Sequence, residues 1–211
     1  MVFICNPNNP TSTYVGVDKL ARFLESLPDD ILVVMDEAYY EYVSAHDFPQ
    51  TIEMHKNNDC LITLRTFSKV HSLAGLRIGY AIAHRKVVKI LHIVRQPFNV
   101  NRLAQAAALA ALKCKDKNLP AIQESQKERE KLREAILEAG WECPPSQTNF
   151  LYVIPRNFPG DVCEPLLQRG VIIRDMTPFG ANKNTFRLTV GLPEENQKFL
   201  EALDSVLATQ S

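Results

Sequence analysis

Lys69 is the residue of this sequence best placed to do covalent chemistry. Ser68 precedes it with a hydroxyl group, and Arg77 follows eight positions later. A lysine amine that is partly buried beside other cations becomes neutral more readily and can then attack a carbonyl carbon. Arg65 and Arg77 are the neighbouring cations that the sequence offers. Lys69 is therefore a candidate nucleophile, whereas an ordinary lysine would be only a solubilising surface charge.

Asp36 is the second candidate, because it directly follows the continuous apolar run Ile31–Met35. Such a run is typical of a parallel strand that is covered on both faces. Open α/β sheets bind their ligands at the carboxyl ends of strands, which is where Asp36 falls. The alternative is a helix N-cap or a turn carboxylate.

Alternating strands and helices are expected to position these residues. Short apolar runs at 2–5, 31–35, 61–64 and 79–83 predict strands, and the spacing of apolar residues predicts helices over 17–27 and over 86–111 with a break near Pro97. The succession predicts an α/β fold with a mostly parallel sheet.

The pattern of predicted strands and helices changes beyond a charge-rich helix predicted at 124–139. Strands are predicted at 149–154, 171–174 and 186–190, and helices at 160–169 and 194–208. We therefore expect two domains, 1–117 with the mostly parallel sheet and 118–211 as a small α+β domain. The charges of the helix at 124–139 are expected to form a solvated face, and Trp141 and Phe150 are expected in the core.

Four motifs occur in a fixed order along the chain. They are Asn6-Pro7-Asn8-Asn9-Pro10-Thr11, Asp36-Glu37-Ala38-Tyr39, Ser68-Lys69 with Leu73-Ala74-Gly75-Leu76-Arg77-Ile78-Gly79-Tyr80, and Phe186-Arg187-Leu188-Thr189-Val190-Gly191. In type and order they resemble the motifs of the class I and II aminotransferases of fold type I. The resemblance covers essentially the whole chain and implies an incomplete large domain of the pyridoxal-phosphate-dependent transferases. Ser12 stands where the family usually has glycine, and the family's long N-terminal stretch has no counterpart here.

The resemblance implies pyridoxal 5'-phosphate as cofactor. The cofactor-binding residues that it implies are Asn9, Asp36, Tyr39, Ser68, Lys69 and Arg77. Asn9 and Tyr39 would hydrogen-bond the ring oxygen, and Asp36 would hold the pyridine nitrogen. Ser68 and Arg77 would bind the phosphate, while Lys69 would carry the cofactor as a Schiff base and move protons as the catalytic base. Gly75 and Gly79 are expected to let the intervening loop turn tightly.

Arg187 and Arg174 are the substrate-binding residues implied by the resemblance. Together with Pro97-Phe98-Asn99-Val100-Asn101, they resemble the histidinol-phosphate aminotransferase group, which implies amino transfer between histidinol phosphate and 2-oxoglutarate in histidine biosynthesis. The alternatives are an aromatic or other amino-acid aminotransferase, a phosphothreonine-type decarboxylase, or a catalytically silent fragment with a structural or dimer-forming role. For Arg174 a surface ion pair is a further alternative.

Composition favours a small-molecule partner in the cytoplasm. The 24 basic and 24 acidic side chains balance, so no electrostatic footprint indicates nucleic acid or a membrane surface. Five cysteines at wide spacings and five scattered histidines match no disulfide framework and no metal site. No apolar run approaches the roughly 20 residues that span a bilayer. The expected partners are an amino donor and an oxo-acid acceptor, and the resemblance implies a homodimer.

Overall fold

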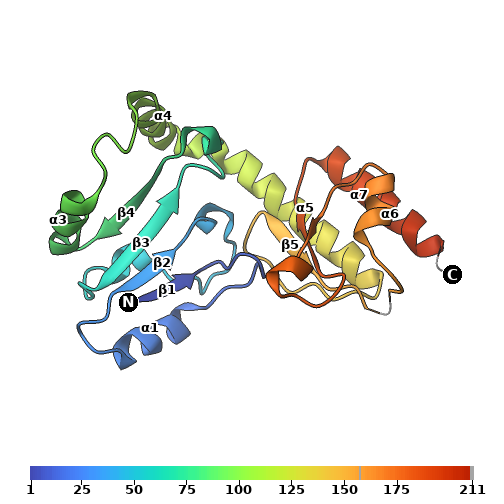
Figure 1. Ribbon diagram of the computed structural model, residues 1–211, viewed down its shortest axis with the longest axis horizontal. Helices are drawn as coiled ribbons and strands as arrows, with labels where there is room; N and C mark the ends of the chain where they lie inside the picture. The colour runs from blue at the N-terminus through green and yellow to red at the C-terminus, as the bar shows by residue number, and fades with distance from the viewer. Residues whose placement is uncertain (157, 210–211) are drawn as a thin grey trace. The chain divides into compact units, whose positions relative to one another are not determined.

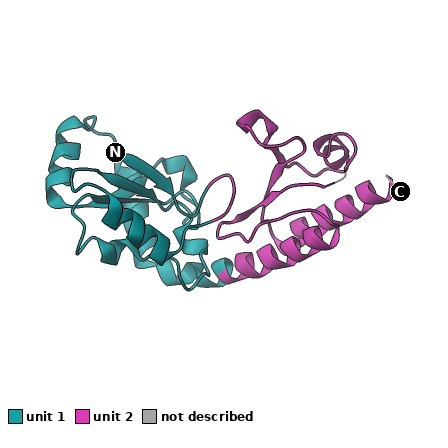
Figure 2. Cartoon of the chain, turned by 90° about the horizontal axis from the view of Figure 1, so that it is seen from below, with its two compact units in different colours: residues 1–8, 14–122 teal, residues 9–13, 123–211 magenta. Residues whose placement is uncertain are grey.

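The computed structural model describes residues 1–156 and 158–209 of the chain. These residues divide into two compact units, coloured separately in Figure 2. Unit 1 contains residues 1–8 and 14–122, and unit 2 contains residues 9–13, 123–156 and 158–209. The segment 9–13 thus belongs to unit 2 although it comes early in the chain. The domain boundary at residue 118 stays a prediction.

A four-stranded sheet forms the centre of unit 1 (Figure 1). Its order is β1 (Val2–Cys5), β2 (Val33–Asp36), β3 (Leu61–Thr66) and β4 (Gly79–Ala83). The first three strands are parallel and β4 is antiparallel to β3. The expected mostly parallel α/β sheet is confirmed.

Register brings the carboxyl ends of the three parallel strands together. Cys5 pairs with Asp36, and Asp36 pairs with Leu64. The β2 run Val33–Met35 is buried throughout, and Val33 and Met35 pack with Leu20 of helix α1 (Val17–Ser26) on one face of the sheet. Burial of this apolar run fixes the strand ends from which the candidate residues project.

The remaining helices of unit 1 follow the predicted pattern in outline. They are α2 (Thr51–Met54), α3 (Arg85–Val94) and α4 (Arg102–Lys113), with short 3-10 turns at Tyr40–Tyr42, Ala74–Leu76 and Lys115–Asn118. The expected break near Pro97 separates α3 from α4, and Asn101 caps α4 by accepting a hydrogen bond from the Ala104 N–H. The short helix α2 was not predicted, since four residues are too few for a helical period to show.

Unit 2 consists of a three-stranded antiparallel sheet and helices that pack on it. The strand order is β5 (Phe150–Val153), β7 (Phe186–Thr189) and β6 (Arg174–Asp175). The helices are α5 (Leu119–Glu138), whose first four residues belong to unit 1, α6 (Cys163–Gln168) and α7 (Pro193–Ala208), and a 3-10 turn lies at Thr177–Phe179. The core contains Leu132, Leu151, Phe186 and Phe199 from four of these elements.

Two expectations about unit 2 were wrong in detail. Of the strand predicted at 171–174, only Arg174 pairs with β7, and the strand continues to Asp175. Val171 and Ile173 pack on the core and Ile172 is exposed, so the side chains alternate as predicted although the backbone there does not pair. The charge-rich face of α5 is not solvated throughout, since Glu128 and Arg129 are buried. Over the described residues, no helix is long and apolar enough to cross a membrane.

Candidate functional site

A pocket of about 500 Å³ lies at the carboxyl ends of β2 and β3, within unit 1. Four of the predicted cofactor-binding residues line it: Asp36, Ser68, Lys69 and Arg77. Parallel pairing of β2 with β3 explains why residues 33 positions apart share one pocket.

Asp36 ends β2 half-buried, and one of its carboxylate oxygens is already engaged. The Ala38 N–H donates to Asp36 Oδ1 at 3.1 Å, which closes a tight turn after the strand. This turn brings Tyr39 back beneath the lysine, and the Tyr39 side chain is buried. The local turn therefore places a carboxylate and a phenol beside the same pocket.

Lys69 follows β3 in a loop that its neighbours hold in place. Thr66 Oγ1 accepts the Ser68 N–H at 3.1 Å, and the carbonyl oxygen of Lys69 accepts the Ser72 N–H at 2.9 Å. The amine lies 4.9 Å from the centroid of the Tyr39 ring. No carboxylate among residues 1–156 and 158–209 forms an ion pair with it. A lysine amine without a counter-ion is available to react.

Arg77 closes the other side of the pocket from the end of a 3-10 turn. Its backbone is left-handed, with φ of 51°, and its Nη1 donates to the Ala74 carbonyl oxygen at 2.8 Å. Gly79 is required here because a Cβ would lie 2.8 Å from the carbonyl oxygen of Arg65. Gly75 differs from the expectation, since a Cβ there would meet nothing within 4 Å and its φ is not left-handed.

Arg65 lines the same pocket, but its charge is already paired. Its Nε and Nη2 donate to Glu37 Oε2 at 3.0 and 2.8 Å, and its guanidinium carbon lies 3.4 Å from the centroid of the Tyr40 ring. Glu37 is fully buried. Arg65 is therefore not the uncompensated cation that the sequence suggested beside Lys69.

A buried chain of hydrogen bonds leads to the other oxygen of Glu37. Thr51 Oγ1 donates to Glu37 Oε1 at 2.6 Å, and Thr63 Oγ1 donates to Thr51 Oγ1 at 3.0 Å. Because the Thr63 proton is thus used, His55 must donate to Thr63 Oγ1 through Nε2–H, at 3.0 Å. Burial raises the pKa of Glu37 and outweighs the hydrogen bonds from Thr51 and Arg65, which act to lower it. Burial lowers the pKa of His55.

Three predicted site residues belong to unit 2, and two of them are joined. Arg187 Nη1 donates to Asn9 Oδ1 at 3.0 Å, so β7 and the segment 9–13 share a polar contact. The Nε atom of Arg187 is buried and has no hydrogen-bond partner among the described residues. A buried guanidinium donor without a partner is suited to an anionic ligand.

Arg174 is the direct cross-strand neighbour of Arg187, from β6. Directly opposite residues of an antiparallel pair point to the same face of the sheet. Arg174 is exposed and forms no ion pair with a described residue, so the alternative of a surface ion pair is not seen. The two guanidinium groups concentrate positive charge on one face.

Two contributors to this geometry were missed from the sequence. The buried ion pair of Glu37 with Arg65 was not predicted, although neighbouring residues at a strand end point to opposite sides and so have different partners. Phe150 is buried, as expected of a core residue, but its contact with the guanidinium group of Arg187 was not predicted. No group of three His, Cys, Asp or Glu side chains in the described part of the chain is arranged to hold a metal ion.

Comparison with known proteins agrees with this geometry. The family model for aminotransferase class I and II matches residues 1–203. The chain is 45% identical to an aromatic amino acid aminotransferase from Nocardia farcinica over 95% of its length, and 40% identical to a histidinol-phosphate aminotransferase from Geobacillus thermodenitrificans over 98%. It spans 55% and 56% of those two relatives, little more than half of each.

The fold likewise matches a solved structure. The crystal structure of histidinol-phosphate aminotransferase from Sinorhizobium meliloti in complex with pyridoxal-5'-phosphate superposes with a TM-score of 0.82 at 27% identity. The match covers 100% of this chain and 58% of that protein. With the family model matched over nearly its whole length, this chain belongs to the class I and II aminotransferase family.

Proposed function

We propose that this chain supplies the lysine-bearing part of the active site of a pyridoxal-phosphate-dependent aminotransferase. The observation that carries the proposal is the pocket in which the unpaired amine of Lys69 lies with Asp36, Ser68 and Arg77. Two cations, a carboxylate and a hydroxyl around one cavity match the groups of the cofactor. The amine suits its aldehyde, the carboxylate its pyridine nitrogen, and the hydroxyl and guanidinium its phosphate.

Pyridoxal 5'-phosphate, when bound, supplies an aldehyde that reacts with amines and an aromatic ring that withdraws electrons from the substrate. Lys69 would be the attachment point, and its released amine would serve as the base that moves a proton. The Asp36 carboxylate would pair with the protonated pyridine nitrogen. Ser68 and Arg77 bind the phosphate, with the planar fork of Arg77 suited to two oxygens. Tyr39, packed beneath Lys69, is a further proposed cofactor contact. Asn9 is proposed as a cofactor contact from the family resemblance alone.

The proposed reaction is amino transfer between L-histidinol phosphate and 2-oxoglutarate. Arg187 supports it, because a guanidinium group with a buried, unpartnered Nε is suited to a carboxylate or a phosphate. Arg174, directly opposite on β6, adds a second cation for a doubly charged group. Amino transfer to aromatic oxo acids is the second candidate, favoured by the 45% identity to the Nocardia farcinica relative.

A homodimer in the cytoplasm belongs to the same proposal. Apolar side chains on α3 and α4, among them Ile93, Val94 and Leu103, are exposed in this chain and would be covered by a second surface. All five cysteines are free thiols, which suits a reducing compartment.

The decisive experiment is titration of the chain with pyridoxal 5'-phosphate, followed by absorbance, borohydride reduction and mass mapping. The expected result is one reduced adduct, on Lys69. Lys69→Ala should remove the absorbance band and the adduct. Lys56→Ala, which changes an exposed lysine paired with Glu53, should keep both. A band that never appears, or one that survives Lys69→Ala, would leave the chain with a structural role only.

Oxo-acid use separates the two substrate candidates. Initial rates with imidazole-acetol phosphate and with phenylpyruvate are compared, with glutamate as the amino donor in both assays. Preference for imidazole-acetol phosphate is expected. Preference for phenylpyruvate would replace the histidinol-phosphate assignment with the aromatic one.

A further inference from the structure

Phe150 is a buried apolar residue, but it lies outside the main cluster of buried apolar side chains in the described part of unit 2. Register explains this. Phe150 pairs with Thr189 and Tyr152 pairs with Arg187, so Phe150 and Arg187 lie on the same face of the sheet. Leu151 and its partner Leu188 point to the opposite face and do belong to the core. Phe150 is thus an aromatic residue on the arginine face.

The guanidinium group of Arg187 is held at two points on this face. Its Cζ lies 4.9 Å from the centroid of the Phe150 ring, within the range of a cation–π interaction. Its Nη1 donates to Asn9 Oδ1. The Nε atom, buried and without a described partner, remains for a ligand.

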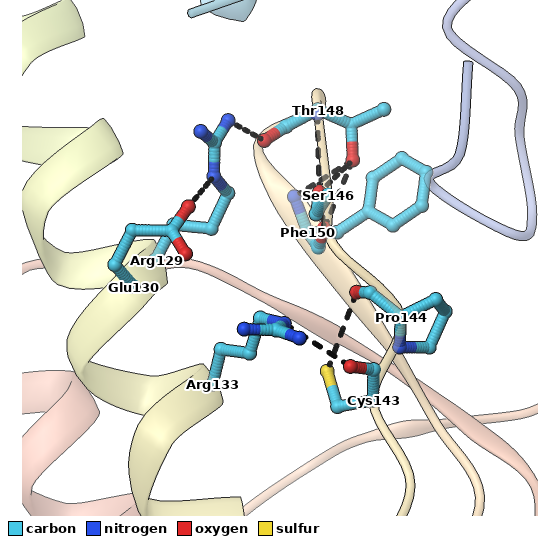
Figure 3. Close-up of polar contacts among 8 residues, drawn as sticks. All are labelled: Arg129, Glu130, Arg133, Cys143, Pro144, Ser146, Thr148 and Phe150. Carbon is cyan, nitrogen blue, oxygen red and sulfur yellow. Dashed lines mark hydrogen bonds and ion pairs between the residues drawn. The ribbon is translucent and has the colours of Figure 1, made fainter. Parts of the chain in front are cut away.

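The backbone of Phe150 is itself fixed by buried polar groups (Figure 3). Ser146 Oγ and Thr148 Oγ1 donate to the Phe150 carbonyl oxygen at 2.7 and 2.9 Å. Arg129 Nη1, from α5, donates to the Thr148 carbonyl oxygen at 3.2 Å. Ser146, Thr148 and Arg129 are each 1% exposed. A hydrogen-bonded segment anchored on α5 therefore sets where the Phe150 ring lies.

We propose that Phe150 is a positioning residue for Arg187: its ring holds the guanidinium group in the orientation that receives the anionic group of the substrate. This proposal rests on the proposed function of Arg187. The physical reason is entropic as well as electrostatic. A long arginine side chain that is already ordered loses less rotamer freedom when it binds, and the face of the ring attracts the cation.

The first test uses the wild-type chain and needs no cofactor. In a proton–nitrogen NMR spectrum of the arginine Nε–H groups, the Arg187 signal is identified by its loss in Arg187→Lys. We expect this signal to be shifted upfield by the ring current of Phe150 and to exchange slowly with water. Phe150→Leu should remove the ring-current shift. Phe186→Leu, which removes a buried ring from the core face of the neighbouring strand, should retain it. A wild-type signal without the shift would overturn the proposal, whether or not the variants fold.

The second test measures the dissociation constant for 2-oxoglutarate by calorimetry on the cofactor-loaded chain. Loss of a cation–π contact predicts a rise of about two- to five-fold in Phe150→Leu. Phe186→Leu is the control for lost packing and should stay near wild type. Equal dissociation constants for Phe150→Leu and Phe186→Leu would contradict the positioning role of Phe150 but would leave the proposed function of Arg187 standing. An unchanged constant in Arg187→Gln would instead contradict the proposed function of Arg187, so the two failures are distinguishable.

Discussion

Arg65 donates from Nε and Nη2 to one oxygen of Glu37, at 3.0 and 2.8 Å, and so joins the ends of two neighbouring strands. Thr51 donates to the other oxygen. The carboxylate is fully buried and receives three hydrogen bonds, as a buried charge requires. The pair therefore stiffens the wall of the candidate cofactor pocket instead of adding a free cation to it.

Replacement of Glu37 should be strongly destabilising. Glu37→Gln leaves the Arg65 guanidinium buried without its counter-ion, and breaking a buried pair from one side costs about 3–5 kcal/mol. The free energy of unfolding from urea titration measures this loss. Glu53→Gln breaks the exposed pair with Lys56 and should change stability little. A similar small effect in both variants would show that the buried pair contributes no more than a surface one.

Replacement of Ser12 by glycine should stabilise the chain. Ser12 has a left-handed backbone, with φ of 62°, and its buried hydroxyl has no hydrogen-bond partner among the described residues. Ser12→Gly removes both penalties and should add about 1 kcal/mol to the free energy of unfolding. Ser72→Gly relieves a left-handed backbone at an exposed position. Its change in the free energy of unfolding therefore measures the backbone contribution without that of a buried hydroxyl. The prediction fails if Ser12→Gly is less stable than wild type.

Gly79 should tolerate no side chain, whereas Gly75 should. A Cβ on Gly79 would lie 2.8 Å from the Arg65 carbonyl oxygen, so Gly79→Ala must separate β3 from β4 locally. Overpacking of this kind costs about 1–3 kcal/mol. Gly75→Ala meets no atom within 4 Å and should be neutral or slightly stabilising. Thermal unfolding of the two alanine variants, compared side by side, checks the difference.

Stability should decrease as the pH falls below 6.5, and His55 should contribute to the decrease. Burial lowers the pKa of His55 from its ordinary value of 6.5, so the unfolded chain takes up the proton first. Its contribution is therefore complete above pH 6.5 and is lost as the pH falls toward the lower folded-state pKa. His71, whose pKa burial also lowers, acts in the same direction.

The measurement is the free energy of unfolding between pH 7.5 and 5.5. His55→Gln keeps an N–H donor for Thr63 but cannot titrate, so its stability should depend less on pH than that of the wild type. His46→Gln replaces an exposed imidazole and serves as the matched control. Identical pH dependence in His55→Gln and wild type would contradict the prediction.

Asp36 should decide the affinity for pyridoxal 5'-phosphate. Asp36→Asn keeps the shape of the side chain but removes the charge proposed to face the pyridine nitrogen. A hydrogen bond to a charged group contributes about 1.5–3 kcal/mol, so the dissociation constant should rise about ten-fold or more. An absorbance titration measures it, and Asp29→Asn, on an exposed loop, is the control. Equal affinity in Asp36→Asn and wild type would remove Asp36 from the proposed site.

The sequence by itself determined the elements and the family. Apolar runs such as Ile31–Met35 and Leu61–Leu64 predicted the parallel strands because burial on both faces requires continuous apolar sequence. Motif order then indicated the aminotransferase family, which the family match over residues 1–203 shows. Four of the six candidate cofactor residues lie around one pocket because β2 and β3 are parallel neighbours.

Only the tertiary structure decided which charges are paired and which rings are core. The partner of Arg65 is Glu37, 28 positions away, and the partner of Arg187 is Asn9, 178 positions away. Phe150 and Leu151 are adjacent buried apolar residues, yet Phe150 contacts an arginine on one face of the sheet and Leu151 packs in the main apolar cluster on the other. Strand pairing and register set these contacts, and local periodicity carries no information about which residue lies opposite.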